Sequence, residues 1–278
     1  MIWVLCSIAI MVLAVIIFLL IPYSPIRSKF QRDVQSHLEL SSAMYTGIFT
    51  KEDTASLPEP VQNHFRMAGL IGKPIPNSVR AFMSSVPLYE TNDKPPLNID
   101  YTLYLFASPV RLAHIQTSMF GIPFEGYDSS QEGIGFMKGV IGKVFTLFNV
   151  AGPNMDSGQI LTWLGEAPLL PSIFLSEYII WETIDATSVR ATLNYKGVTG
   201  SGVYTFDENG FFQSFHTKGR AKIDTNGSVE YIGWSAMYDE WQQDENGTCA
   251  PYSVRAVWHE SGGDLVYFAS SGFDVVYD

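Results

Sequence analysis

The sequence predicts a mainly β protein (α+β). An N-terminal transmembrane helix carries an antiparallel curved sheet or half-barrel that encloses short helices. Three observations support this prediction. The segment from Ile2 to Ile21 contains no charged residue, no Gly and no Pro. Beyond it, short runs that alternate apolar and polar residues lie between turn-forming residues, as in antiparallel strands. One almost wholly apolar helical segment, around Ile160, interrupts these runs.

The N-terminal segment, residues 1–22, is long enough to be a membrane anchor. Twenty helical residues at about 1.5 Å each span about 30 Å, the thickness of the hydrocarbon core of a bilayer. A cleaved signal peptide would begin with basic residues and end at a small-residue cleavage site. Nothing basic precedes Ile2, and Pro22 and Tyr23 directly follow the apolar run. We therefore expect an uncleaved single-pass helix, with the membrane as a partner.

The membrane side on which the rest of the chain lies is not decided by the sequence. Arg27, Lys29 and Arg32 follow the helix, whereas only the α-amino group precedes it. This asymmetry favours a cytoplasmic location for the residues after the helix. The family resemblance described below favours the extracytoplasmic side.

Residues 23–55 predict an amphipathic helix followed by a linker at residues 50–55. Apolar residues recur every four positions on one face, and the series continues further on: Ile26, Phe30, Val34 and Leu38, then Met44 and Ile48. Such a helix either lies on the membrane or a partner, or packs on its own domain as a stalk. We favour the stalk.

Residues 56–278 predict a β-rich soluble domain. It opens with Ser56 and Glu59 at the spacing of a capping box, ahead of a short helix. The clearest strand is 187–195, where Val189, Ala191 and Leu193 share one face. Further strands are expected at 78–86, 99–107, 110–118, 203–206, 211–217, 229–236, 254–258 and 265–269.

A helical segment lies in the middle of these strands. Asp156 or Ser157 is the expected N-cap, and Pro171 is expected to open a second helical turn. The segment between them is apolar nearly all round, so it must be covered on every side. The simplest cover is the concave face of a curved sheet.

Three groups of residues occur one after another along this domain, in a characteristic order. They are Leu57-Pro58-Glu59-Pro60-Val61-Gln62 with Phe65-Arg66; Gly158-Gln159-Ile160-Leu161 with Trp163-Leu164, Glu166-Ala167 and Trp181; and Phe206-Asp207-Glu208 with Gly219-Arg220, Trp258 and Tyr267. This order resembles an uncharacterised bacterial family, a domain of unknown function with many membrane-anchored members. The departures are Asn63, where the family suggests a basic residue, and residues 120–130.

The resemblance spans residues 57–278 and implies no established activity. Its pattern of an entry helix, many strands and an embedded apolar helix is similar to the half-barrel of lipoprotein carriers. That similarity implies a lipid or another apolar small molecule as the ligand. It is an analogy at the level of the fold, and a fold does not settle a function.

Charge and motif content disfavour several classes of function. The chain has 17 Lys and Arg against 28 Asp and Glu, a net charge of −11, which argues against nucleic acid as a partner. No zinc, phosphate-loop or nucleophile-elbow spacing occurs, so no metal, cofactor or catalytic residue is expected. Each of the five histidines is expected on the surface or on a strand face. The sequence therefore favours a protein that is not an enzyme.

Four residues are the candidate ligand-binding side chains. Glu166 lies on the apolar helix and Arg220 follows the later hairpin, so the two are candidates for a buried pair. They form either a polar anchor for a ligand head group or a structural ion pair, and the second is favoured. Trp163 and Trp181 are either pocket walls or core residues, and core packing is favoured.

Three hypotheses follow, in order of preference. The first is a membrane-tethered half-barrel that binds a lipid or another apolar ligand. The second is a structural or interaction protein whose own helix fills the interior and whose protein partner is unknown. The third is a hydrolase that uses scattered carboxylates. An open apolar cavity beneath the helix of Trp163 would favour the first, and a filled interior the second.

Overall fold

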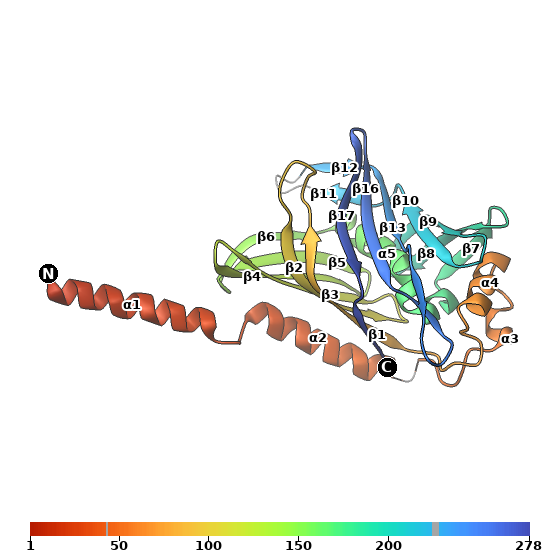
Figure 1. Cartoon of the computed structure of the whole chain (residues 1–278), viewed down its shortest axis with the longest axis horizontal. Helices are drawn as coiled ribbons and strands as arrows, with labels where there is room; N and C mark the ends of the chain where they lie inside the picture. The colour runs from red at the N-terminus through yellow and green to blue at the C-terminus, as the bar shows by residue number, and fades with distance from the viewer. Residues whose placement is uncertain (43, 224–227) are drawn as a thin grey trace.

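A computed structural model describes residues 1–42, 44–223 and 228–278. Four helices precede the strands: α1 (Ile2–Leu20), α2 (Pro25–Ser41), α3 (Lys51–Thr54) and α4 (Glu59–Met67). A fifth helix, α5 (Pro153–Gly165), and two 3₁₀ turns, η1 (Ala167–Leu169) and η2 (Pro171–Leu175), interrupt the strands. Figure 1 shows α1 projecting from the domain along the long axis of the molecule.

Fourteen strands form one large sheet. The path through it runs β6-β5-β4-β3-β2-β1-β17-β16-β13-β10-β9-β8-β7, and β18 pairs with β1. The strands are β1 (Ser78–Leu88), β2 (Leu97–Phe106), β3 (Arg111–Met119), β4 (Ile122–Gln131), β5 (Ile134–Ile141), β6 (Phe145–Ala151), β7 (Ile179–Thr183), β8 (Ser188–Tyr195), β9 (Val198–Phe206), β10 (Phe212–Thr217), β13 (Gly233–Met237), β16 (Ser253–Glu260), β17 (Gly263–Ser271) and β18 (Asp274–Tyr277). Two small hairpins stand apart from it: β11 (Ala221–Ile223) with β12 (Val229–Tyr231), and β14 (Trp241–Gln243) with β15 (Cys249–Pro251).

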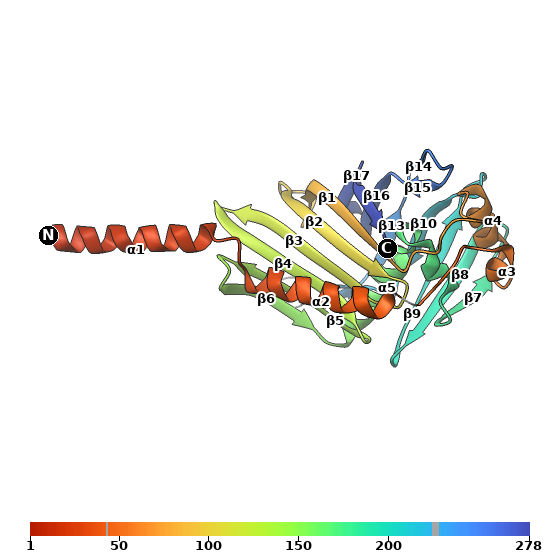
Figure 2. The ribbon, with the colours of Figure 1, turned by 90° about the horizontal axis from the view of Figure 1, so that it is seen from below.

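The sheet is antiparallel throughout the described residues and is not closed, because β6 and β7 are its two edges. It curves around α5, as Figures 1 and 2 show. The predicted fold class, an antiparallel curved sheet enclosing short helices, is therefore confirmed. In β8, Val189, Ala191 and Leu193 are fully buried on the concave face, as the alternation predicts.

The helical segment fills one half of this concave face. Every residue of α5 from Gly158 to Gly165 is buried, and so are all of η1 and most of η2. Small residues permit the close approach. A Cβ at Gly200 of β9 would lie 2.9 Å from Leu161 Cγ, and one at Gly165 would lie 2.9 Å from the Trp234 ring. The expectation that the sheet covers this segment is met.

Helix α2 packs against the outer, convex face of β2, β3 and β4 (Figure 2). Ser24 caps it by accepting from the backbone N–H of Arg27 at 3.4 Å. Ile26, Phe30 and Val34 are buried against this face, so the helix is docked on its own domain. Met44 and Ile48 do not extend the apolar face, because the helix ends at Ser41 and both side chains are exposed.

Several predicted helix starts are wrong. Pro58, rather than Ser56, precedes α4, and no side chain caps that helix. The capping box is instead Thr50 with Asp53, which starts α3 inside the stretch expected to be a linker. Pro60 lies in the first turn of α4, where its fixed φ suits the helix.

Helix α5 also begins earlier than predicted, with Gly152 as N-cap and Pro153 in its first turn. Asp156 does not cap it, because its carboxylate accepts from the backbone N–H of Gly135 on β5 at 2.7 Å.

Some strands and one histidine differ from the prediction too. Residues 122–151, for which no strand is predicted, form β4, β5 and β6. The single strand expected at 229–236 is two strands, β12 and β13, in different sheets. His64, expected on the surface or on a strand face, is fully buried in α4.

Helix α1 is the one helix of the described residues that is long and apolar enough to cross a membrane. None of its residues is buried, and only its last turn meets the domain, at Lys143. A signal sequence can have the same length and the same apolar composition as α1. The break at Pro22 separates α1 from α2 and from the domain on which α2 is docked.

Candidate functional site

The C-terminal half of α5 is fixed to the concave face by three ring side chains. Trp163 is fully buried, and its indole Nε1 donates to the backbone oxygen of Phe106 at 3.0 Å. The hydroxyl of Tyr204 donates to Leu164 O at 2.7 Å, and that of Tyr238 to Gly165 O at 3.0 Å. These two carbonyls lie in the last turn, where helix acceptors lack intrahelical partners. In this structure Trp163 is a core residue that holds the helix.

Arg111 on β3 forms a buried ionic cluster beside α5. Its Nε and one terminal nitrogen donate to the two oxygens of Glu166 at 2.7 and 3.0 Å. The other terminal nitrogen donates to Asp128 of β4 at 2.7 Å and to Gln159 of α5 at 3.2 Å. The hydroxyl of Tyr101 on β2 accepts the last N–H. All five N–H groups of the guanidinium therefore have an acceptor.

Burial and charge pairing act in opposite directions on this cluster. Burial raises the pKa of Glu166 above its ordinary value, although the charge of Arg111 opposes the rise. Burial alone would lower the pKa of Arg111, but Glu166, Tyr101 and Asp128 hold it well above its usual range. Each charge is thus tolerated only because its partner is present. The cluster ties α5 to β3 and β4.

Arg220, just after β10, lies over two neighbouring indole rings. Its guanidinium carbon is 4.8 Å from the ring centroid of Trp234 and 4.8 Å from that of Trp258. Its Nε donates to Thr162 Oγ1 on α5 at 3.0 Å. Within the part of the chain that the structure describes, no hydrogen bond joins either terminal nitrogen of Arg220.

The pair considered from the sequence, Glu166 with Arg220, is not formed. Both oxygens of Glu166 accept from Arg111, which leaves no ion pair between Glu166 and Arg220. The charge of Arg220 still lowers the pKa of Glu166, but more weakly than the charge of Arg111 does. Arg220 therefore lies near the buried cluster without being part of it.

Trp181, the fourth candidate, lies on β7 beside η2 rather than beside α5. Its half-buried ring is 6.1 Å from that of Phe174 and 5.7 Å from that of Tyr204, centroid to centroid. The structure thus places three of the four candidates, Trp163, Glu166 and Arg220, on or against α5.

Beyond α5 the concave face is only partly covered. The rings of Trp234 and Trp258 belong to it, since the two residues are cross-strand partners and Trp234 touches α5. Towards the hairpins β3–β4 and β5–β6, a set of half-buried apolar side chains continues from the core: Met119, Met137, Ile141 and Phe148. We call these four residues the open lining. They lie on the face of β3, β5 and β6 that also bears Arg111 and Asp128, and Met119 and Ile141 are the last residues of their strands.

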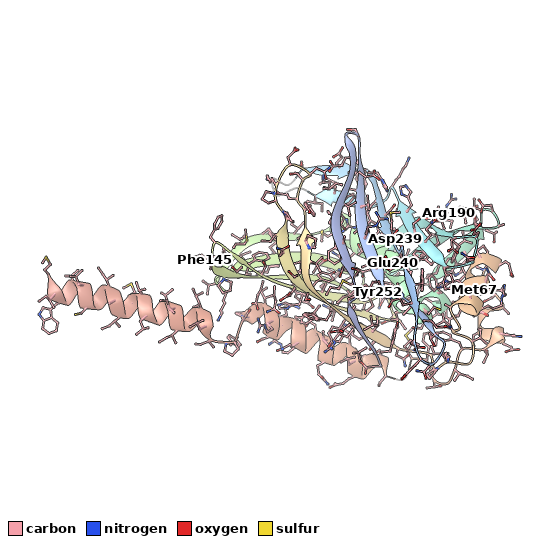
Figure 3. All side chains as sticks on the ribbon, viewed as in Figure 1. Met67, Phe145, Arg190, Asp239, Glu240 and Tyr252 are labelled. Atoms are coloured by element: carbon pink, nitrogen blue, oxygen red, sulfur yellow. The ribbon has the colours of Figure 1, made fainter. Side chains whose placement is uncertain are left out.

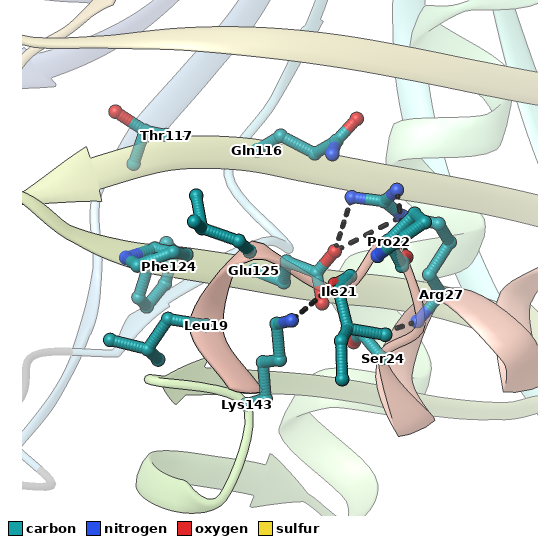
Figure 4. A pocket seen from close by; sticks show the side chains of 12 residues that line it. Leu19, Ile21, Pro22, Ser24, Arg27, Gln116, Thr117, Phe124, Glu125 and Lys143 are labelled. Carbon is teal, nitrogen blue, oxygen red and sulfur yellow. Dashed lines mark hydrogen bonds and ion pairs between the residues drawn. The ribbon is translucent and has the colours of Figure 1, made fainter. Parts of the chain in front are cut away.

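Two small cavities lie near the ends of α2. One, of about 210 Å³, is bounded by the last turn of α1 and by β3, β4 and the β5–β6 turn (Figure 4). Arg27 crosses it and pairs with Glu125 at 2.8 Å, while Lys143 reaches the end of α1. The other, of about 400 Å³, is lined by His37, Leu40, Met44 and Tyr195, among others.

A polar chain crosses the outer face of β13 and β16. Ser235 Oγ lies 2.9 Å from His259 Nε2, and His259 Nδ1 lies 2.8 Å from Asp264. Ser235, His259 and Asp264 are thus connected in the order of a nucleophile, a general base and an orienting acid. However, Ser235 is 5% exposed, and the strands around it pair their backbone amides within the sheet. No donor is therefore placed for an oxyanion, and the chain serves as a cross-strand hydrogen-bond ladder.

Arg111 is the main site residue that the sequence analysis missed. A signal for it exists, because the alternation of the strand expected at 110–118 puts Arg111 on the same face as Ala113 and Ile115. A charge on an apolar face requires a buried partner. Asp128 carried no such signal, since no strand was expected around it.

Among the described residues, no group of three or more His, Cys, Asp or Glu side chains could hold a metal ion.

Comparison with known proteins gives a family but no activity. A solved domain from Vibrio parahaemolyticus, described as an outer membrane lipoprotein-sorting protein, is weakly similar, with 9% sequence identity and a TM-score of 0.38. The similarity covers 73% of this chain and 86% of that chain. No curated protein matches. The sequence pattern of DUF6544, a family of unknown function, matches residues 47–270. The match covers most of the chain, and the protein therefore belongs to this family of unknown function.

Proposed function

We propose that the protein is a single-pass membrane protein whose half-barrel binds an anionic amphiphile, an acyl chain with a carboxylate or phosphate head. The acyl chain would lie on the open lining, and the head group would bind Arg220. The observation that carries the proposal is the state of Arg220, a half-buried cation over two indole rings with no acceptor for its terminal N–H groups in the described structure.

The chemistry of Arg220 suits an anionic head group. A guanidinium presents parallel N–H donors that match carboxylate and phosphate oxygens. Contact with the rings of Trp234 and Trp258 restricts the side chain of Arg220, so less freedom is lost when an anion binds. Arg111 cannot serve in this way, because all five of its donors are already used.

The open lining suits the apolar part of such a ligand. Two of its four residues, Met119 and Met137, are methionines, whose unbranched side chains adapt to differently shaped apolar partners. Helix α1 supports the membrane part of the proposal, because its length and composition match a bilayer span. A tethered domain stays close to a supply of amphiphiles.

A second candidate function is supported by a different observation. The helical segment from Gly158 to Phe174 is buried along almost its whole length, so half of the interior is filled by the chain itself. This favours an interaction protein whose helical segment only completes its core. In that case Arg220 would bind no ligand, and its substitution would leave lipid contacts unchanged.

Photolabelling tests the proposal. The full-length chain is reconstituted in phosphatidylcholine nanodiscs with a photoactivatable fatty acid, and labelled peptides are mapped by mass spectrometry. Labelling is expected on strands β3 to β6 of the open lining. Arg220→Gln removes a charged hydrogen-bond donor and is expected to reduce this labelling about tenfold, whereas Arg220→Lys retains the charge and should lose less.

The matched control is Arg190→Gln, since Arg190 is exposed and pairs only with Glu182 on the outer surface. Labelling confined to α1, or equal labelling of β3 to β6 in wild type and Arg220→Gln, would reject amphiphile binding. A thermal unfolding curve for each variant shows whether the fold is retained.

A further inference from the structure

Two hairpin tips at one end of the sheet carry exposed apolar side chains. The β3–β4 and β5–β6 hairpins turn at Phe120-Gly121 and at residues 142–144. The exposed fractions are 98% for Phe120, 70% for Phe145 and 60% for Val144. Figure 3 shows Phe145 at the end of the domain from which α1 extends. We call residues 118–123 and 141–147 the apolar tips; Lys143 is their single charged residue.

The backbone at Phe120 does not explain why an aromatic residue stands there. Phe120 has φ of 53° and Gly121 has φ of 77°, a left-handed pair that favours Gly, Asn or Asp. Two other hairpins turn through the same kind of pair and place a charged residue first, Glu132 before Gly133 and Lys196 before Gly197. Those two charges pair with each other at 3.1 Å.

The three turns therefore form an internal comparison. Local geometry accepts a charged, water-compatible residue at this position, as Glu132 and Lys196 show. Phe120 instead carries a ring that is almost wholly exposed, in a backbone conformation unfavourable for a bulky side chain. Packing within the described residues does not account for it, so a partner outside the chain is the remaining physical reason.

The apolar tips lie level with the end of α1. The ammonium of Lys143 donates to Phe18 O at 2.8 Å and to Ile21 O, and it lies 5.4 Å from the centroid of the Phe18 ring. Leu19 and Lys143 line the same cavity, shown in Figure 4. Figure 2 shows both hairpins ending beside the break between α1 and α2.

We propose that the apolar tips enter the interfacial layer of the bilayer leaflet in which α1 ends. The inference rests on the membrane anchoring in the proposed function. If α1 spans the bilayer, its last turn lies at the interface, and the contacts of Lys143 hold the tips at that depth. Aromatic and aliphatic side chains around one basic residue are the composition of segments that insert there.

This placement also sets how the open lining meets the membrane. Met119 and Ile141 are the last residues of β3 and β5 and belong both to the apolar tips and to the open lining. The open end of the concave face would then be directed towards the lipid. An acyl chain could pass from the leaflet to the lining without crossing water. The rest of the domain, which carries the acidic excess, stays in the aqueous phase.

Site-specific fluorescence tests this inference. The full-length chain, with Cys6 and Cys249 replaced by Ser, receives one new cysteine in place of Phe120, Phe145 or Ile180. Ile180 is 62% exposed on the edge strand β7 and serves as the aqueous control. Each cysteine is labelled with an environment-sensitive dye in phosphatidylcholine nanodiscs, with or without spin-labelled lipid.

Quenching by lipids spin-labelled near the head group is expected to be about threefold stronger at positions 120 and 145 than at 180, because interfacial side chains meet the label. A dye at the native Cys6, in Cys249→Ser, reports separately on α1 and should be quenched by deep spin labels. If Cys6 is quenched but positions 120 and 145 behave like 180, the insertion of the tips is wrong and anchoring stands. If Cys6 is not quenched, anchoring fails and the inference fails with it.

A second variant excludes an effect of the dye. Phe120→Glu recreates the turn sequence found at Glu132-Gly133, so the hairpin should still form. The Phe120→Glu variant is expected to move a dye at position 145 towards the aqueous phase, so that the spin-labelled lipid quenches the dye less. Unchanged quenching at 145 would show that Phe120 does not insert. Photolabelling of the open lining is a separate readout and can persist in that case.

Discussion

Arg111 joins β2, β3, β4 and α5 through one guanidinium group. Two carboxylates, Glu166 and Asp128, accept from it, and each of these side chains is only 14% exposed. Removing the arginine would leave two buried acids close to each other with no cation between them. Such uncompensated charges cost far more than the intact pair contributes.

Replacement of Arg111 by Met is therefore expected to lower the free energy of unfolding by about 3–5 kcal/mol. The comparison is Arg190→Met, which breaks an exposed pair with Glu182 and should cost less than about 1 kcal/mol. Denaturant unfolding of the detergent-solubilised chain, followed by tryptophan fluorescence, measures both. Equal losses in the two variants would show that the cluster is not a buried ionic one.

His64 makes stability depend on pH. Its Nδ1 accepts from the backbone N–H of Phe212 at 3.2 Å, and burial lowers its pKa from 6.5 to about 4. The unfolded chain takes up this proton near its unperturbed pKa, whereas the folded chain does so only near pH 4. Stability is therefore complete above about pH 6.5 and is lost as the pH falls towards 4, by about 3 kcal/mol.

His64→Gln retains an acceptor without a titrating proton. The difference in unfolding free energy between about pH 7 and pH 4 is expected to shrink by about 3 kcal/mol in this variant. Chemical unfolding at several pH values measures the difference. Parallel pH profiles for the variant and the wild type would assign the acid sensitivity to other groups, such as His114, whose pKa burial also lowers to about 4.

For Glu166, the sequence predicts the need for a cationic partner but not which residue the partner is. A carboxylate on an otherwise apolar helix requires a cation, so the sequence predicts that Glu166 needs a partner. The partner is Arg111 rather than Arg220, because the order of strands in the sheet decides which cation faces the helix end. Strand order is set by long-range pairing, which one sequence does not reveal.

At the scale of elements, α2 holds the end of α1 at a fixed place on the domain. Phe30 is its central contact, stacked on His114 at 5.2 Å and edge-on to Tyr127 at 5.6 Å between centroids. Ile26 and Val34 flank it on the buried side. The docking of α2 therefore sets the distance between α1 and the apolar tips.

Phe30→Ala is expected to cost about 3–5 kcal/mol and to loosen α2 from the sheet, because it empties the centre of this contact. Leu40→Ala on the same helix is the control, since Leu40 is 74% exposed. Hydrogen exchange of the α2 amides should rise in the first variant only. If exchange is unchanged in Phe30→Ala, the helix is not held by this packing.

The elements differ in how well the sequence predicts them. β8 was predicted because Val189, Ala191 and Leu193 alternate with polar residues. β4 was not, because Pro123, Gly126 and Asp128 have low strand preference. It forms because β3 and β5 pair with it on both sides, which is a tertiary effect. Most of the apolar tips and of the open lining belongs to this unpredicted region, so the sequence does not reveal them.

At the scale of the whole molecule, the sheet is an open half-barrel with two unlike halves. Helix α5 lies between β5 and β9, and η1 and η2 continue it towards β7, while the far ends of β3 to β6 run on to the apolar tips beside α1. The sequence predicts a curved sheet around an apolar helix and, from the uncharged start, a membrane span. Which half the helix leaves uncovered depends on the sheet order and was not predictable.

The central claim is that this uncovered half binds an anionic amphiphile at Arg220. Native mass spectrometry of the full-length chain, released from detergent micelles, tests it most directly. We expect the wild type and Arg190→Gln to retain one adduct with the mass of a fatty acid or phospholipid, and Arg220→Gln to lose it. A bare polypeptide from the wild type, or an adduct unaffected by Arg220→Gln, would contradict the claim.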